Sequence, residues 1–192
     1  METGKSYFNR NLLIILSAVC LLTVTAISVA TWKAGQGSTP VMMVVLNGLI
    51  LLIPFGLLFG SIYVLAVGWR EHRFQGVLNP GLSRVIRWAP RVASILIILL
   101  LSLFSFDVFS GNASFWQMVG GFFIHNLPGI VLLILVIIAW KRPIVGFISF
   151  LIFALGFAAF FVRSFISPNL FFFVLPILLI AFLYYADWQW NK

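Results

Sequence analysis

Residues 116–140 read WQMVGGFFIHNLPGIVLLILVIIAW, and this stretch sets the fold class. It contains no Lys, Arg, Asp or Glu, and a tryptophan stands at each of its ends. A helix needs about 20 apolar residues to cross the hydrocarbon core of a bilayer. A strand of a membrane barrel would instead alternate polar and apolar residues over about ten positions. The stretch therefore predicts a transmembrane helix.

The rest of the chain repeats this pattern. Hydrophobic residues make up 62% of the sequence and charged residues only 8%, so no segment remains for a soluble domain. We predict an all-α polytopic integral membrane protein in which residues 1–192 form a single transmembrane domain with six transmembrane helices. The predicted spans are residues 11–32, 41–69, 92–110, 116–140, 143–162 and 169–187.

The basic residues predict how the chain is oriented. Six spans with a cytoplasmic N-terminus place all but two of the 12 Lys and Arg residues on the cytoplasmic side, the exceptions being Lys33 and Arg163. Such an excess is typical of cytoplasmic loops, and the tryptophans lie near predicted helix ends, as expected at the membrane interface. We therefore expect both termini in the cytoplasm. The net charge of +8 is explained by this bias, so nucleic acid is not an expected partner.

The first span allows two interpretations. Lys5 and Arg10 precede an apolar run that ends in Ser28-Val29-Ala30, which also resembles a cleavable secretory signal. The run is longer than the usual apolar core of about 7–15 residues, and its removal would reverse the orientation of the following helices. We expect the helix to be retained.

The loop between the second and third spans predicts a short cytoplasmic interfacial helix over residues 80–89. Its two faces are sorted into an apolar set and a basic set: Leu82, Val85, Ile86 and Ala89 against Arg84, Arg87 and Arg91. Asn79 is expected to cap the helix and Pro90 to end it before the third span. We expect these arginines to bind anionic lipid headgroups, at about 1 kcal/mol each. The alternative is that they only determine topology.

Prolines recur inside the even-numbered spans, at Pro54, Pro128 and Pro176. Trp140 and Trp188 each follow the latter two by 12 residues, which suggests that helices three to four and five to six are related hairpins. The alternative is that both residue types are simply common in membrane helices. Each proline leaves a carbonyl unpaired one turn earlier and can kink its helix.

Few polar side chains lie inside the predicted spans, and these are the candidate site. Asp107, His125, Asn126 and Asn47 could line a polar pocket in the outer half of the membrane. For Asp107 the competing interpretation is an ion pair with Arg163 near the outer surface. For His125 and Asn126 it is hydrogen bonding between helices, worth about 0.6–2 kcal/mol.

Several chemistries need residues that the predicted spans lack. The spans contain no lysine for a retinal Schiff base, no second histidine for a haem, and no set of three or four metal ligands. No nucleophile motif surrounds Ser102 or Ser105, and no phosphate-binding loop or dinucleotide fingerprint occurs. We therefore expect no enzyme, no metal and no cofactor.

A family resemblance emerges over residues 84–188. It is carried by RVIRWAPR at 84–91, LFSFDVF at 103–109, HNLP at 125–128, IAWK at 138–141 and the apolar run that follows Gly146. These motifs resemble a family of small prokaryotic membrane proteins known only as a domain of unknown function. Lys141-Arg142-Pro143 departs from the acidic residue expected after that tryptophan. The resemblance implies a prokaryotic plasma membrane and no assigned activity.

These observations favour a non-catalytic membrane protein that acts through packing, through contact with anionic lipid, or as an accessory subunit of other membrane proteins. The alternative is a small-solute or proton-coupled transporter that uses the candidate polar pocket. A lipid-modifying enzyme is a third and weaker interpretation.

Overall fold

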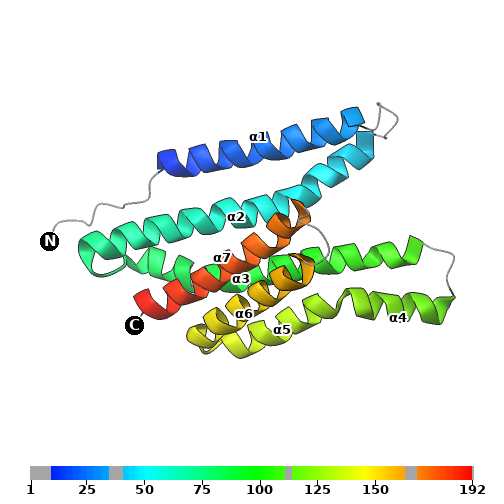
Figure 1. Cartoon of the computed structure of the whole chain (residues 1–192). Helices are drawn as coiled ribbons and strands as arrows, with labels where there is room; N and C mark the ends of the chain where they lie inside the picture. The colour runs from blue at the N-terminus through cyan, green and yellow to red at the C-terminus, as the bar shows by residue number, and fades with distance from the viewer. Residues whose placement is uncertain (1–9, 35–40, 111–113, 163–167, 192) are drawn as a thin grey trace.

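The computed structural model describes residues 10–34, 41–110, 114–162 and 168–191, and within them every regular element is helical (Figure 1). The all-α prediction is confirmed. The elements are α1 (Arg10–Ala34), α2 (Val41–Gln75), α3 (Pro80–Ser105), the short 3-10 helix η1 (Phe106–Ser110), α4 (Phe115–His125), α5 (Leu127–Ala139), α6 (Pro143–Val162) and α7 (Pro168–Trp190).

Three of the described helices are long and apolar enough to cross a membrane. Their apolar segments are Asn11–Ala30, Ile50–Gln75 and Pro80–Leu103, and α4 with α5 adds a fourth if the bent pair is one span. The described parts of α6 and α7 carry shorter apolar segments, Pro143–Ala159 and Val174–Trp190. The chain is therefore a multi-pass membrane protein.

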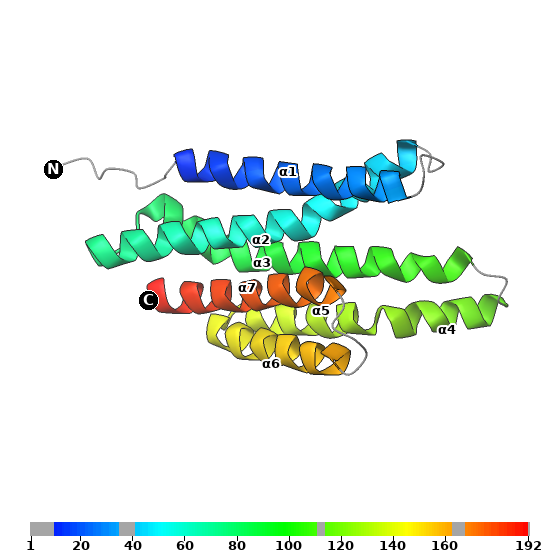
Figure 2. The same ribbon diagram turned by 45° about the horizontal axis from the view of Figure 1, so that its top comes forward.

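The helices form one bundle with α7 near its centre. Helix α7 packs against α2, α3 and α6, and α5 packs against α3 and α6. Helix α1 lies at the edge and, among the described elements, contacts only α2. Figures 1 and 2 both show the starts of α1, α3 and α6 and the ends of α2, α5 and α7 at the same end of the bundle. That end also carries most of the described basic residues.

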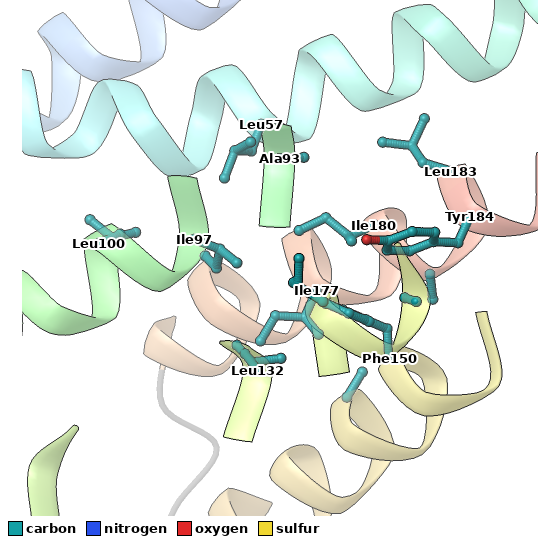
Figure 3. Close-up of a cluster of buried hydrophobic side chains, with 14 residues drawn as sticks. Leu57, Ala93, Ile97, Leu100, Leu132, Phe150, Ile177, Ile180, Leu183 and Tyr184 are labelled. Carbon is teal, nitrogen blue, oxygen red and sulfur yellow. The ribbon is translucent and has the colours of Figure 1, made fainter. Parts of the chain in front are cut away.

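Five helices meet in the hydrophobic core. Leu57 of α2, Ile97 of α3, Leu132 of α5, Phe150 of α6 and Tyr184 of α7 all belong to one buried cluster (Figure 3). In lipid, such contacts stabilise helix association by van der Waals packing rather than by removing apolar surface from water. This core fixes the position of α3 along the axis of α7.

Helix α3 runs through Pro90 without interruption, so the prediction that Pro90 ends a separate helix over residues 80–89 is wrong. A proline inside a helix leaves the carbonyl four residues earlier without its usual partner. Side chains bind the backbone around this point: the Ser94 hydroxyl donates to the Pro90 carbonyl at 2.6 Å, and the Arg91 guanidinium donates to the Arg87 carbonyl. These two bonds add hydrogen-bond donors to carbonyls beside the proline, and prolines are tolerated inside membrane helices.

The predicted span over residues 116–140 is divided into two helices. Helices α4 and α5 meet at Asn126 with a bend of 47°. Pro128 stands in the first turn of α5, where a missing N–H removes no helical hydrogen bond. Pro54 and Pro176 instead lie inside α2 and α7. The three prolines therefore have different structural roles.

Candidate functional site

Two buried charges face each other between α3 and α7. The Nη1 atom of Arg91 lies 3.0 Å from Oδ2 of Asp187, and the two side chains are only 9% and 4% exposed. Burying an ion pair costs desolvation energy, which is recovered only where the geometry is good and further hydrogen bonds satisfy both groups. Both conditions are met here.

The guanidinium of Arg91 also reaches the turn between α5 and α6. Its Nη2 atom donates to the Trp140 carbonyl at 2.9 Å, and its Cζ atom lies 5.8 Å from the centre of the Trp140 ring. An arginine above an aromatic ring gains a cation–π attraction. One side chain thus links α3, α7 and the α5–α6 turn.

The carboxylate of Asp187 is held from the other side by Asn191. The Nδ2 atom of Asn191 donates to Oδ1 of Asp187 at 2.9 Å, and its Oδ1 atom accepts from the Ser83 hydroxyl at 2.6 Å. We call Ser83, Arg91, Trp140, Asp187 and Asn191 the ion-pair network. Since both charges have several partners, the arrangement is suited to holding helices together.

A second buried carboxylate caps the start of α3. Glu71, on the last turn of α2, is 3% exposed, and its Oε1 atom accepts from the Asn79 backbone N–H at 2.6 Å. The Asn79 side chain in turn accepts from the Gly81 backbone N–H at 2.9 Å. Because a helix N-terminus carries partial positive charge, a carboxylate is stabilised there. Glu71 therefore fixes the α2–α3 turn.

Both acids whose side chains are described are thus buried, while the bases around them are exposed. We call the set of exposed bases that surrounds the network the basic end: Arg70, Arg73, Arg84, Arg87, Lys141 and Arg142. Lys33 is also exposed but lies at the last turn of α1, at the opposite end of the bundle (Figure 1). Among the described side chains, the basic end therefore presents only positive charge to its surroundings.

The expected placement of Arg91 is wrong. The sequence pattern put it on the exposed face with Arg84 and Arg87, but its side chain is buried against α7, whereas the other two are exposed. The reason is that α3 does not stop at Pro90, so the turn carrying Arg91 enters the bundle beside Asp187.

The side chains of three predicted site residues lie outside the described part of the structure. Asn47 lies in α2 and Asp107 in η1, but their side chains are outside the described part of the structure. Arg163 lies outside the described residues altogether. The predicted pocket and the predicted pair of Asp107 with Arg163 therefore stay predictions.

The neighbours His125 and Asn126 lie in different surroundings. The His125 side chain is exposed, and its Nδ1 atom is 2.9 Å from the carbonyl of Gly121 in the same helix. The Asn126 side chain is half-buried and accepts from the Ser102 hydroxyl of α3 at 3.1 Å. The structure thus shows a hydrogen bond between helices for Asn126 and one within its own helix for His125.

Sequence reasoning overlooked Asp187, Asn191 and Glu71. A signal for the first two existed, since Ile180, Tyr184, Asp187 and Asn191 follow one another at helical spacing along one face of α7. A carboxylate that continues an apolar stripe predicts a basic partner on the facing helix. Glu71 carried no such signal, because its burial depends on the turn that follows α2.

A family model described as a domain of unknown function, DUF7670, matches residues 79–192. The chain therefore belongs to this family, as the resemblance over residues 84–188 predicted. The matched region begins at the residue that precedes α3 and contains the entire ion-pair network. No curated protein and no solved structure matches the chain.

Proposed function

We propose that this member of a family without an assigned activity is a non-catalytic membrane protein that binds anionic lipid and serves as an accessory subunit of membrane assemblies. In this proposal it crosses a prokaryotic plasma membrane six times, with both termini in the cytoplasm. The observation that carries the proposal is the division of charge among the described residues of the basic end, where Glu71 and Asp187 are buried and the exposed charged side chains are all basic.

The exposed arginines at the start of α3 support the lipid contact. Arg84 and Arg87 are exposed beside the buried face of the same helix turns, on which Ile86 is fully buried. This is the arrangement of an amphipathic segment at a membrane interface. An anionic surface attracts each such arginine by about 1 kcal/mol.

Two helices support the accessory role. Within the described structure α1 contacts only α2, and α4 buries none of its residues. Both helices leave apolar faces for lipid or for the helices of another protein. Exposed contiguous apolar surface is typical of such contacts.

The lipid contact is tested by the lipids that accompany the protein in a mild detergent. We expect the wild type to carry phosphatidylglycerol in excess over phosphatidylethanolamine relative to the source membrane. The double variant Arg84→Gln/Arg87→Gln should lose most of this excess, at about fivefold per arginine. Lys33→Gln, at the other end of the bundle, should keep it. Equal excess in all three proteins would disprove the lipid contact, and repeated purification as a lone monomer would disprove the subunit role.

A transporter is the second candidate, because the bend at Asn126 breaks a predicted span. In many transporters, ends of broken helices line the substrate site. Asp107, His125, Asn126 and Asn47 would then form a polar site in the outer half of the membrane. Proton uptake into proteoliposomes, followed with an enclosed pH dye, would test this in Asp107→Asn and His125→Ala. Proton flux that equals that of the wild type in both variants would remove these residues from any such role.

A further inference from the structure

A polar hollow of about 640 Å³ opens between the last turns of α2 and α7. Its walls are Trp69, His72, Arg73, Tyr185, Gln189 and Trp190. The Arg73 guanidinium carbon lies 5.8 Å from the Trp69 ring, and the His72 ring is stacked on Trp190 at 5.9 Å. The described lining of the hollow thus combines a guanidinium, an imidazole and two indoles and includes no carboxylate.

An apolar hollow of about 360 Å³ continues from the polar one. It shares Trp69, Tyr185 and Trp190 with its neighbour and adds Leu65, Ala66, Phe182 and Ala186. A single groove between α2 and α7 therefore has a polar mouth at the basic end and an apolar floor toward the middle of the bundle.

The register of the two helices explains why this groove is continuous. Helices α2 and α7 run in the same direction and are packed against each other (Figure 1). Ala66, Trp69 and Arg73 follow at one-turn intervals on α2, as Phe182, Tyr185 and Gln189 do on α7. Seven residues of helix cover about 10 Å. The groove is therefore long enough to take a headgroup phosphate and the first part of an acyl chain.

Gly68 makes room for one wall of the groove. A Cβ atom at this position would lie 2.6 Å from the ring of Trp190 and 2.7 Å from the side chain of Ile86. Only the absence of a side chain lets Trp190 pack against α2. The indole of Trp190 is thereby placed between the polar and apolar parts.

The charge of the mouth favours an anionic ligand. Arg73 lines the hollow and is exposed, and Arg70, about one helical turn earlier on α2, is also exposed. The Nδ1 atom of His72 is buried and has no hydrogen-bond partner among the described residues. Arginine and histidine donors suit a phosphate oxygen, while a cationic headgroup would be repelled by these arginines.

We infer that the α2–α7 groove is a binding site for one anionic phospholipid, with its phosphate at His72 and Arg73 and one acyl chain along Ala66 and Phe182. The inference rests on the proposed lipid contact and deepens it, because it names a discrete site away from Arg84 and Arg87. The same donors could hold free phosphate, so the test must separate the two sources.

Native mass spectrometry of the full chain in detergent tests the site. Dioctanoyl phosphatidylglycerol is titrated, with dioctanoyl phosphatidylcholine and inorganic phosphate as separate probes. We expect one saturable phosphatidylglycerol adduct in the wild type, with weaker phosphatidylcholine binding. Arg73→Gln and His72→Phe should each weaken it about fivefold or more, and Ala66→Trp should block it by filling the apolar part. Lys33→Gln, an exposed base at the opposite end of the bundle and outside the groove, is the control and should bind as the wild type does.

The outcomes separate the two proposals. If the wild type carries excess phosphatidylglycerol but Arg73→Gln, His72→Phe and Ala66→Trp bind it unchanged, the groove is overturned and the general lipid contact stands. The lipid assignment would be overturned if inorganic phosphate bound as tightly as phosphatidylglycerol and Ala66→Trp left the binding of both unchanged. A wild type without any anionic lipid excess would overturn the proposed function itself. Thermal unfolding of each variant shows whether lost binding is only lost folding.

Discussion

At the scale of single residues, Arg91 and Asp187 behave as a unit. Each has the other as its ionic partner at 3.0 Å, and each is further bound by neutral groups, Trp140 for the base and Asn191 for the acid. Removing one charge would leave the other buried without its counter-charge. Removing both would leave a neutral interface between α3 and α7.

This coupling predicts a non-additive pair of substitutions. Asp187→Ala should lower the free energy of unfolding by about 3–5 kcal/mol, because the Arg91 charge would stay buried alone. Arg91→Met/Asp187→Leu should recover most of that loss, since apolar pairs often replace buried ion pairs without cost. Thermal unfolding in detergent, followed by tryptophan fluorescence, measures both.

The exposed neighbour Arg87 supplies the control for this experiment. Arg87→Ala should change stability by less than 1 kcal/mol, because an exposed charge contributes little to stability. A loss in Asp187→Ala no larger than in Arg87→Ala would contradict the prediction. The prediction would also be contradicted if the loss of stability in Arg91→Met/Asp187→Leu equalled the sum of the losses in Arg91→Met and Asp187→Leu alone.

At the scale of helices, hydrophobicity predicted where most elements lie but not how they are interrupted. The span predicted over residues 143–162 coincides with α6, because charge and proline bound the apolar run at its start. Pro90 was expected to end a helix and does not, while the kink allowed for at Pro128 is a 47° bend at Asn126 that divides the predicted span into two helices. Whether a proline stops a membrane helix depends on the groups that bind the backbone around it, and at Pro90 these include Ser94 and Arg91 of the same helix.

The candidate site shows the same limit. Arg84, Arg87 and Arg91 share one face of an isolated helix, so sequence periodicity treats them alike. Only the packing of α7 against α3 buries Arg91 and leaves the other two exposed. The basic character of this end followed from composition, whereas the partner of each buried charge required the tertiary structure.

The contact between α6 and α7 gives a prediction at this scale. A Cβ atom at Gly146 would lie 2.8 Å from both the Ala139 side chain and the Tyr184 ring, and Tyr184 is fully buried. Gly146→Ala should therefore destabilise the protein by about 1–3 kcal/mol through overpacking. Gly156→Ala is the matched control on the same helix, since nothing lies within 4 Å of its Cβ position. It should be neutral or slightly stabilising, because alanine favours helix by up to about 1 kcal/mol.

Thermal unfolding of the two glycine variants decides this prediction. Equal melting temperatures for Gly146→Ala and Gly156→Ala would contradict the close approach of α6 to α7. A lower melting temperature for Gly156→Ala alone would contradict it as well.

At the scale of the whole molecule, the described charges divide between the two ends of the bundle. The basic end gathers exposed residues from α2, α3 and the α5–α6 turn, although these are far apart in sequence. Lys33 lies at the opposite end (Figure 2). Because Lys and Arg are retained on the cytoplasmic side, this arrangement predicts that the basic end faces the cytoplasm.

Cysteine labelling in intact bacterial cells tests that orientation. The chain has a single cysteine, Cys20, so Cys20→Ser gives a background without thiols. In this background Lys33→Cys should react with a membrane-impermeant maleimide in intact cells. Arg84→Cys and Arg142→Cys should react only after the cells are opened, because both positions belong to the basic end. Labelling in intact cells at positions 84 and 142 but not at 33 would reverse the orientation, and the anionic lipid contact would then have to be sought in the outer leaflet.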